Sequence, residues 1–129
     1  MNNAWLVDDD EEMATAIGLM LKILKFDWQH YLDAPSAANA LLDGPAPDLI
    51  LLDINMPQVS GKDFLEFVRM RSAFDGLPIV MASSEFNEVQ MDELFALGAD
   101  GFVLKPVSID ELELAIDQAM TKKGKPRQT

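Results

Sequence analysis

Acidic residues follow two apolar segments of this chain at the points where those segments end. Asp53 comes directly after the apolar run 49–52, and three aspartates, residues 8–10, come directly after the apolar run 4–7. An unbroken apolar run predicts a strand that is buried on both faces of a parallel sheet. Since open sheets of this kind bind ligands at the carboxyl ends of their strands, we expect a functional site where these acids meet.

A cluster of carboxylates needs a positive charge or a proton to be stable. Two carboxylates about 4 Å apart repel each other by about 4 kcal/mol at an effective dielectric constant of 20. Mg²⁺ suits a site of few carboxylates completed by phosphate and water oxygens. Such a pocket can hold phosphate through the metal, or one carboxylate can itself attack a phosphoryl group. We interpret Asp10, Glu11 and Glu12 as an acidic helix start, where the helix dipole favours negative charge.

Two more predicted strand ends carry residues that suit phosphate chemistry. Ser83 and Ser84 follow the apolar segment 79–82, and Lys105 ends the segment 101–105. A hydroxyl at such an edge can donate to a phosphoryl oxygen, and an ammonium group can balance the acids and contact a transferred phosphoryl group. Each residue alone is also an ordinary turn or strand terminator, so their joint occurrence with the acids is the informative feature.

Strands and helices alternate along the whole chain. Strands are predicted at 4–8, 28–32, 49–53, 79–82 and 101–105. Helices are predicted at about 12–25 and at 87–97, the latter closed by Gly98. A short helix is predicted after Pro35, with Ser36 as its N-cap and Gly44 past its end. Two more are predicted after Ser60-Gly61 and after a capping box of Ser108 and Glu111. This alternation indicates an α/β fold with a parallel sheet covered on both faces.

The half-polar segment 28–32 is typical of an edge strand. An edge position for the second strand favours a doubly wound, flavodoxin-like (βα)5 fold with the strand order 2-1-3-4-5. In that order the first and third strands are neighbours, so Asp8, Asp9 and Asp53 meet. His30 is isolated on this predicted edge strand, and we interpret it as structural rather than as a metal ligand.

Composition limits the classes of protein to which the chain can belong. The 129 residues are enough for one domain, and the absence of cysteine excludes disulfides and thiolate metal sites and fits a cytoplasmic location. No apolar run is long enough to span a membrane, and the N-terminus lacks a basic signal region. The net charge of −12 disfavours direct nucleic-acid binding. Four of the ten basic residues lie at 122–129, which we expect to be a flexible, solvated tail after a domain at 1–121.

These motifs together resemble the receiver domain of two-component response regulators, of the chemotaxis-regulator type. The resemblance covers residues 4–121 and rests on Leu-Val-Asp-Asp-Asp at 6–10, Asp-Ile-Asn-Met-Pro at 53–57 with Gly61, the hydroxyl at 83, and Lys-Pro at 105–106. It implies that Asp53 is the phosphoacceptor and that Lys105 pairs with the phosphoryl group. It also implies an Mg²⁺ site formed by Asp9 directly, Asp8 through water, Asp53 and the backbone carbonyl of Asn55.

Further roles follow from the resemblance. Ser83 and Phe102 resemble the switch hydroxyl and the switch aromatic, and the Lys105–Pro106 bond is expected to be cis. Ser83 stands where threonine is frequent, Phe102 lacks a phenolic hydroxyl, and Ser84 stands where alanine or glycine is usual. The positions of Asn55 and Glu85 tune how water reaches the phosphoryl group in the family, and polar residues at both predict a short-lived phosphoform.

The resemblance implies a signalling switch that catalyses only its own phosphorylation and dephosphorylation. A sensor histidine kinase or phosphotransfer protein would supply the phosphoryl group, and the face of helix 4, strand 5 and helix 5 would control a partner or output domain. A phosphorylation-dependent homodimer through the last helix stays open. The alternatives are a phosphatase with an aspartyl nucleophile, which Asn55 argues against, an FMN carrier, which the acids at 8–10 argue against, and a degenerate receiver that binds partners without phosphate.

Overall fold

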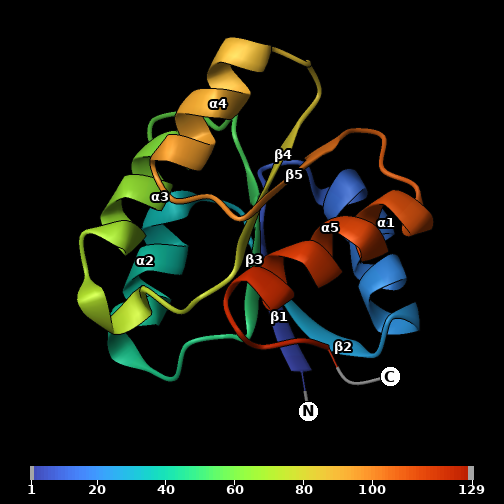
Figure 1. Cartoon of the computed structure of the whole chain (residues 1–129), viewed down its shortest axis with the longest axis horizontal. Coiled ribbons are helices and arrows are strands. Elements are labelled where there is room, and N and C mark those ends of the chain that lie inside the picture. Colours follow the sequence, from blue (N-terminus) through green and yellow to red (C-terminus); the bar gives the residue numbers. More distant parts are fainter. Residues whose placement is uncertain (1, 128–129) are drawn as a thin grey trace.

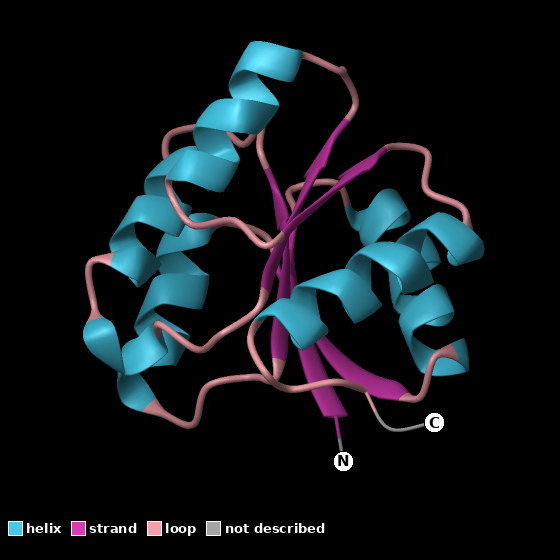
Figure 2. Ribbon diagram, viewed as in Figure 1, coloured by secondary structure: helices cyan, strands magenta, loops and turns pink. Residues whose placement is uncertain are grey.

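The computed structural model describes residues 2–127 of the chain. Five parallel strands form one sheet in the order β2-β1-β3-β4-β5, and five α-helices cover it (Figures 1 and 2). The strands are β1 (Asn2–Val7), β2 (Phe26–Tyr31), β3 (Leu49–Asp53), β4 (Ile79–Ser83) and β5 (Gly101–Leu104). The helices are α1 (Glu11–Ile23), α2 (Ala34–Asp43), α3 (Gly61–Arg69), α4 (Glu88–Ala96) and α5 (Ile109–Lys122), with a short 3-10 helix η1 (Ser72–Phe74). The predicted fold class and strand order are confirmed.

The sheet lies between two helical layers, with α1 and α5 on one face and α2, α3 and α4 on the other (Figure 1). All five residues of the central strand β3 are buried, because the side chains alternate between the two layers. Leu49 and Leu51 contact the core beneath α1 and α5, while Ile50 and Leu52 contact the core beneath α2, α3 and α4. Because both faces of β3 are buried, its sequence at 49–52 is an unbroken run of apolar residues.

The strand β2 lies at one edge of the sheet, as predicted, but its bounds differ from the expected 28–32. It runs from Phe26 to Tyr31 and pairs along its length with β1, from Asn2 opposite Phe26 to Val7 opposite Tyr31. Both strands therefore begin two residues earlier than expected. In β1 the added residues are the half-buried Asn2 and Asn3, which carry no apolar signal and are strand residues because they pair with β2. In β2 they are the buried Phe26 and the exposed Asp27, and the polar Asp27 separates Phe26 from the rest of the predicted segment.

The N-cap of α2 is Asp33, and the predicted assignment to Ser36 is wrong. The Asp33 carboxylate accepts a hydrogen bond from the backbone N–H of Ser36 at 2.7 Å. The helix begins before Pro35 because proline is tolerated in the first turn, where its missing N–H group would have no helical partner. Two other predicted caps are confirmed: Gly98 follows the α4 C-cap with φ +112°, and Ser108 caps α5 through Glu111. The first helix, expected at about 12–25, ends earlier, at Ile23, because Lys25 has the positive φ of +72°.

The C-terminal segment differs from the expected solvated tail in the part that the structure describes. Lys122 is the last residue of α5, and Arg127 folds back onto the helical layer with only 8% of its side chain exposed. Its guanidinium group donates to Asp117 and Glu113 of α5 and, at 3.2 Å, to the Leu24 carbonyl at the end of α1. Residues 128 and 129 lie outside the described residues, and a domain boundary at 121 stays a prediction. Within residues 2–127, no helix combines the length and apolar character that a membrane span requires.

Candidate functional site

The carboxyl ends of β1 and β3 bring the predicted acids together. Val7, the last residue of β1, pairs in register with Leu52 of β3. The next residues, Asp8 and Asp53, therefore emerge side by side at the same edge of the sheet. Both are nearly fully buried, with 1% and 6% of their surface exposed. The sequence prediction that these two acids meet is confirmed.

Lys105 lies between the two buried acids. Its Nζ atom is 2.7 Å from Oδ2 of Asp8 and 3.1 Å from Oδ1 of Asp53. The residue follows β5 directly, and its backbone N–H donates to the Ser83 carbonyl of β4 at 2.8 Å, which holds the start of the following loop. The next peptide bond, Lys105–Pro106, is cis, as expected. The ammonium group thus supplies the positive charge that two neighbouring buried carboxylates require.

The electrostatic environment raises the pKa of the Asp53 carboxyl above its ordinary value. Burial is the main cause, the negative charges of Asp8 and Asp9 add to it, and the charge and hydrogen bond of Lys105 oppose it. For Lys105, burial alone would lower the pKa, but the hydrogen bond to Asp8 and the charges of both acids overcome that effect and raise it. Lys105 is therefore fully charged at neutral pH.

Three acids form a group that could hold a metal ion. One carboxylate oxygen from each of Asp8, Asp9 and Asp53 lies within 4.8 Å of the other two, and Asp9 is exposed to solvent. The Asp8 carboxylate is oriented locally, because its Oδ1 accepts the backbone N–H of Asp10 at 2.9 Å. An all-oxygen set with few protein ligands and an open side fits Mg²⁺. The donors present therefore suit the ion that the sequence predicts.

An open pocket of about 290 Å³ lies above these acids, and most of the predicted site residues line it. Its lining includes Asn55, Ser84, Lys105 and Pro106 in addition to the three acids. Asp10 also lines the pocket, although its carboxylate caps α1 by accepting the Met13 N–H at 3.1 Å. The interpretation of Asp10 as a helix start is confirmed by this cap.

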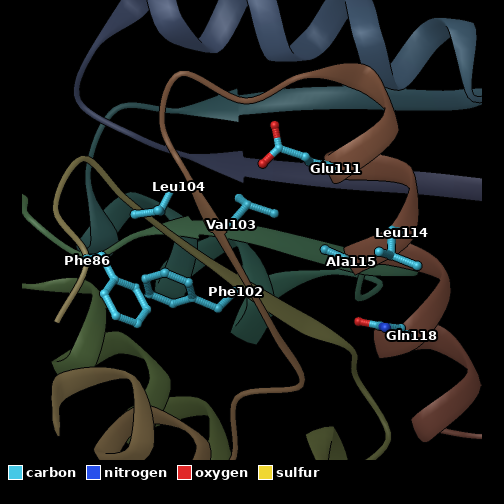
Figure 3. Close-up of a pocket in the computed structure, with 8 residues that line it drawn as sticks. All are labelled: Phe86, Phe102, Val103, Leu104, Glu111, Leu114, Ala115 and Gln118. Atoms are coloured by element: carbon cyan, nitrogen blue, oxygen red, sulfur yellow. The ribbon is translucent and has the colours of Figure 1, made fainter. Parts of the chain in front are cut away.

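Three predicted residues do not line this pocket. Ser83 is completely buried, and its hydroxyl donates to the Glu85 carbonyl at 2.9 Å while accepting the Glu85 N–H at 3.1 Å. In this structure the hydroxyl is thus bonded to the loop after β4. Phe102 is half-buried and lines a separate groove formed by β5, α5 and Phe86 of the loop after β4 (Figure 3). The switch and tuning roles of Ser83, Phe102 and Glu85 remain predictions.

His30 belongs to the surroundings of the site, which the sequence did not indicate. Its Nε2 atom lies 2.7 Å from the main-chain carbonyl oxygen of Asp8. A carbonyl oxygen only accepts hydrogen bonds, so Nε2 carries the hydrogen. The contact spans 22 positions of sequence between the end of β2 and the loop after β1. A polar residue near the carboxyl end of an edge strand next to β1 is the only sequence signal that could have suggested it.

Gly61 lets the first turn of α3 approach the backbone of Asp53. A Cβ atom at this position would lie 2.2 Å from the Asp53 carbonyl oxygen, far closer than atoms can approach. The same turn is fixed by a hydrogen bond from the Gly61 N–H to the Ile54 carbonyl at 2.9 Å. The glycine in the predicted motif is therefore required by space next to the candidate phosphoacceptor.

Known structures share this arrangement. The chain resembles the chemotaxis protein CheY4 of Vibrio cholerae with a TM-score of 0.84 and 26% sequence identity, over 92% of this chain and 98% of the other. A putative response regulator from Chloroflexus aurantiacus has the same fold, with a TM-score of 0.86 at 22% identity over 93% of this chain and 98% of the other.

Curated relatives are regulators about twice as long as this chain. The sensory transduction protein RegX3 of Mycobacterium tuberculosis is 32% identical over 124 residues, which cover 96% of this chain and 52% of RegX3. The phosphate regulon transcriptional regulatory protein PhoB of Rhizobium meliloti is 32% identical over 121 residues, covering 94% of this chain and 52% of PhoB. The chain therefore spans about half the length of these relatives.

The match to a described family is direct. Residues 4–117, which include all of the strand ends described above, match the response regulator receiver domain family. Members of this family are signalling switches of two-component systems. The chain belongs to the response regulator receiver domain family.

Proposed function

We propose that Asp53 accepts a phosphoryl group from a phosphohistidine on a sensor histidine kinase or phosphotransfer protein. The observation that carries this proposal is the contact of Lys105 with both Asp8 and Asp53 in a pocket open to solvent. A phosphoryl group on Asp53 would add negative charge to the pocket. Lys105, and a metal ion held by the acids, would neutralise that charge. All residues of the predicted chemistry are present, which favours an active receiver over the degenerate alternative.

The reaction needs little covalent chemistry from the protein. A carboxylate oxygen of Asp53 attacks phosphorus, the new O–P bond forms as the P–N bond to histidine breaks, and the imidazole leaves with the electron pair and takes up a proton. Lys105 neutralises charge on the transferred group, and the fixed geometry of the pocket positions the nucleophile. Asp8, Asp9, Asp53 and the Asn55 carbonyl would hold Mg²⁺, which when bound neutralises phosphoryl oxygens.

The switch step follows from the position of Ser83. A phosphoryl group on Asp53 offers a stronger acceptor than the Glu85 carbonyl, so the buried hydroxyl turns toward it and the loop after β4 loses its two hydrogen bonds. Movement of that loop makes room for Phe102 to turn inward and changes the face formed by α4, β5 and α5, which controls the downstream partner or output domain.

The lifetime of the phosphoform depends on water in the pocket. Asn55 and Ser84 line the pocket, and Glu85 is the next residue of the chain after Ser84. All three are polar and exposed, so they can position a water molecule for hydrolysis of the acyl phosphate. We therefore propose a short-lived phosphoform, and a lifetime of many hours would contradict this part of the proposal.

Intact mass spectrometry after incubation with acetyl phosphate tests the proposed function. The expected result is a gain of one phosphoryl group that requires Mg²⁺ and is lost in Asp53→Asn. Binding of beryllofluoride, which imitates the phosphoryl group without hydrolysis, separates rapid loss of phosphate from failure to accept it. If neither modification occurs, the chain is a degenerate receiver that binds its partners without phosphate.

A further inference from the structure

The segment that follows α5 turns back onto the body of the domain. Gly124 has φ +72°, and its N–H group donates to the Thr121 carbonyl at 3.0 Å. The N–H group of Lys125 donates to the Met120 carbonyl at 2.8 Å. These are the two bonds of a Schellman turn, in which a glycine with positive φ ends a helix and redirects the chain. Figure 1 shows the chain running back along α5 after this turn, and we call residues 123–127 the C-terminal strap.

The last residue of the strap is a buried arginine. Only 8% of the Arg127 side chain is exposed. Its Nε atom lies 2.9 Å from Oδ1 of Asp117, and its Nη2 atom lies 3.4 Å from Oδ2 of the same residue, so the guanidinium group and the carboxylate meet side by side. Nη2 also donates to Glu113, one turn earlier on α5. Paired contacts of this kind are the strong form of an arginine–carboxylate interaction.

A third acceptor for Arg127 lies on another helix. Its Nη1 atom donates to the Leu24 carbonyl at 3.2 Å. Leu24 is the C-cap of α1, where carbonyl groups lack a helical N–H partner and the helix dipole places partial negative charge. One guanidinium group therefore joins α1 to α5. A lysine in its place would present a single ammonium group, which cannot match this set of acceptors in the same way.

Apolar residues lie beside the place that the Arg127 side chain occupies. Ile23 and Leu24 from the end of α1 and Ile109 of α5 line, together with Arg127, a cleft of about 360 Å³. Such walls suit the aliphatic stem of an arginine while its charged group reaches the acids. The cleft shares no lining residue with the pocket above Asp53. The arginine contacts are therefore separate from the proposed phosphorylation chemistry.

The middle of the strap is held weakly. Residues 124–126 are exposed, and after the Schellman turn their backbone makes no further hydrogen bond within residues 2–127. At the start of the strap, Nζ of Lys123 lies 3.4 Å from the buried carboxylate of Asp100. Segments with few buried contacts open at a low cost in free energy. The closed position of the strap therefore depends mainly on Arg127.

We propose that Glu113, Asp117 and the Leu24 carbonyl form an arginine-binding site, which Arg127 occupies as a removable latch. While the strap is closed, the chain's own guanidinium group blocks the site. When the strap opens, the same acceptors and the same apolar walls are available to an arginine of a partner protein. The C-terminal strap is thus an autoinhibitory contact, and the ligand that the site takes is a guanidinium group on an aliphatic stem.

The short connection to α5 gives Arg127 an advantage over an arginine from another molecule. A short flexible linker holds a tethered group near its site at an effective concentration on the order of millimolar. A free arginine at a lower concentration therefore competes poorly while Arg127 is present. An arginine of a partner displaces the latch only when neighbouring contacts of that partner add affinity, so the strap selects against weak ligands.

Backbone ¹⁵N relaxation of the full chain tests the latch. Arg127→Lys keeps the charge but not the planar group, and Arg127→Gln removes both. Lys125→Gln is the matched control, because it removes one charge from an exposed position of the same strap. We expect an order parameter of about 0.85 for the amide at position 127 in the unmodified protein and in the control. Both Arg127 variants should lower it below about 0.6, because the strap opens.

Titration with two small amides tests the arginine site itself. N-acetylarginine amide and N-acetyllysine amide carry equal charge, and the amide signal of Lys25, next to the Leu24 carbonyl, reports binding. We expect Arg127→Gln to bind the arginine probe at least about tenfold more tightly than the lysine probe. The unmodified protein should bind the arginine probe at least about tenfold more weakly than Arg127→Gln does, because the latch blocks the site. In Arg127→Gln, the further change Asp117→Asn should weaken binding about tenfold, whereas Asp92→Asn on α4 should change it less than about twofold.

Each contrary result overturns the inference. An order parameter at position 127 that is low in the unmodified protein, or that stays high in Arg127→Lys, would show that the guanidinium group is not a latch. Equal affinity for the two probes, or equal effects of Asp117→Asn and Asp92→Asn, would show general attraction to an acidic protein. Sedimentation that reveals a dimer abolished by Arg127→Gln would assign the site to the arginine of a second copy. None of these results depends on phosphorylation of Asp53.

Discussion

The imidazole of His30 is bound to the main chain of Asp8, with Nε2 2.7 Å from the carbonyl oxygen. The Asp8 N–H in turn donates to the Tyr31 carbonyl at 3.1 Å. The end of β2 therefore holds both main-chain polar groups of Asp8. The carboxylate of the same residue contacts Lys105 and belongs to the candidate metal site, so an edge strand orients an acid on which the proposed chemistry depends.

Replacing the His30 imidazole should weaken Mg²⁺ binding. His30→Phe keeps a ring but removes the hydrogen bond, so Asp8 gains freedom and its carboxylate is less well placed. Loss of such outer-shell contacts lowers metal affinity by about 10-fold or more, and we expect a decrease of about that size in calorimetric titrations. His30→Gln, which retains an N–H donor, should recover part of the affinity, and the neighbouring Gln29→Ala should have no effect. Equal affinity of all variants would contradict the positioning role.

Removing the cation between the two acids should destabilise the metal-free protein. Lys105→Met leaves Asp8 and Asp53 buried and uncompensated, so the free energy of unfolding should fall by about 2–4 kcal/mol in urea titrations with chelator present. Added Mg²⁺ should restore more stability in this variant than in the unmodified protein, because the ion replaces the lost charge. Lys62→Met, which breaks an exposed ion pair between α3 and α4, is the control and should change stability little. An unchanged stability of Lys105→Met would argue against the central role of this contact.

The raised pKa of Asp53 predicts a stability effect that depends on pH. A carboxyl with a raised pKa binds its proton more tightly in the folded protein than in the unfolded chain. Its contribution to the free energy of unfolding is therefore fully present below the ordinary pKa of 3.8 and is lost as the pH rises through the raised pKa of the folded protein. At neutral pH the ionised carboxylate therefore opposes folding. We expect Asp53→Asn to be more stable by about 1 kcal/mol at pH 7 without Mg²⁺, with the difference vanishing near pH 3.5. Urea titrations at both pH values measure it, and a variant less stable at pH 7 would show that the Lys105 contact outweighs burial.

The close approach of α3 to Asp53 predicts a strong effect of a single methyl group. Gly61→Ala places a Cβ atom where the Asp53 carbonyl lies, so either the helix or the strand end must move. We expect a loss of at least about 2 kcal/mol in the free energy of unfolding together with slower phosphorylation. Gly44→Ala is the control, because its nearest contact would be an ordinary 3.9 Å and its backbone is extended. Similar stability of both variants would show that the Gly61 contact relaxes at little cost.

The amino-acid sequence by itself determined the strand order and the acids that meet at the carboxyl edge of the sheet. The run 49–52 is apolar because both faces of β3 are buried. The helical spacing of apolar residues, together with the turn residues, predicts the helices between such strands. When β1 and β3 are parallel neighbours, their carboxyl ends lie at the same edge of the sheet, so Asp8 and Asp53 meet there. Local chemistry at strand ends is therefore enough to predict the acids and Lys105.

Tertiary structure alone decided which residues far apart in the sequence contact each other. The His30–Asp8 contact joins residues 22 positions apart. Arg127 was expected in a solvated tail, yet it binds the Leu24 carbonyl 103 positions away. Such contacts depend on the exact distances between packed helices and strands. Neither the spacing of apolar residues along the sequence nor the residue types predict those distances.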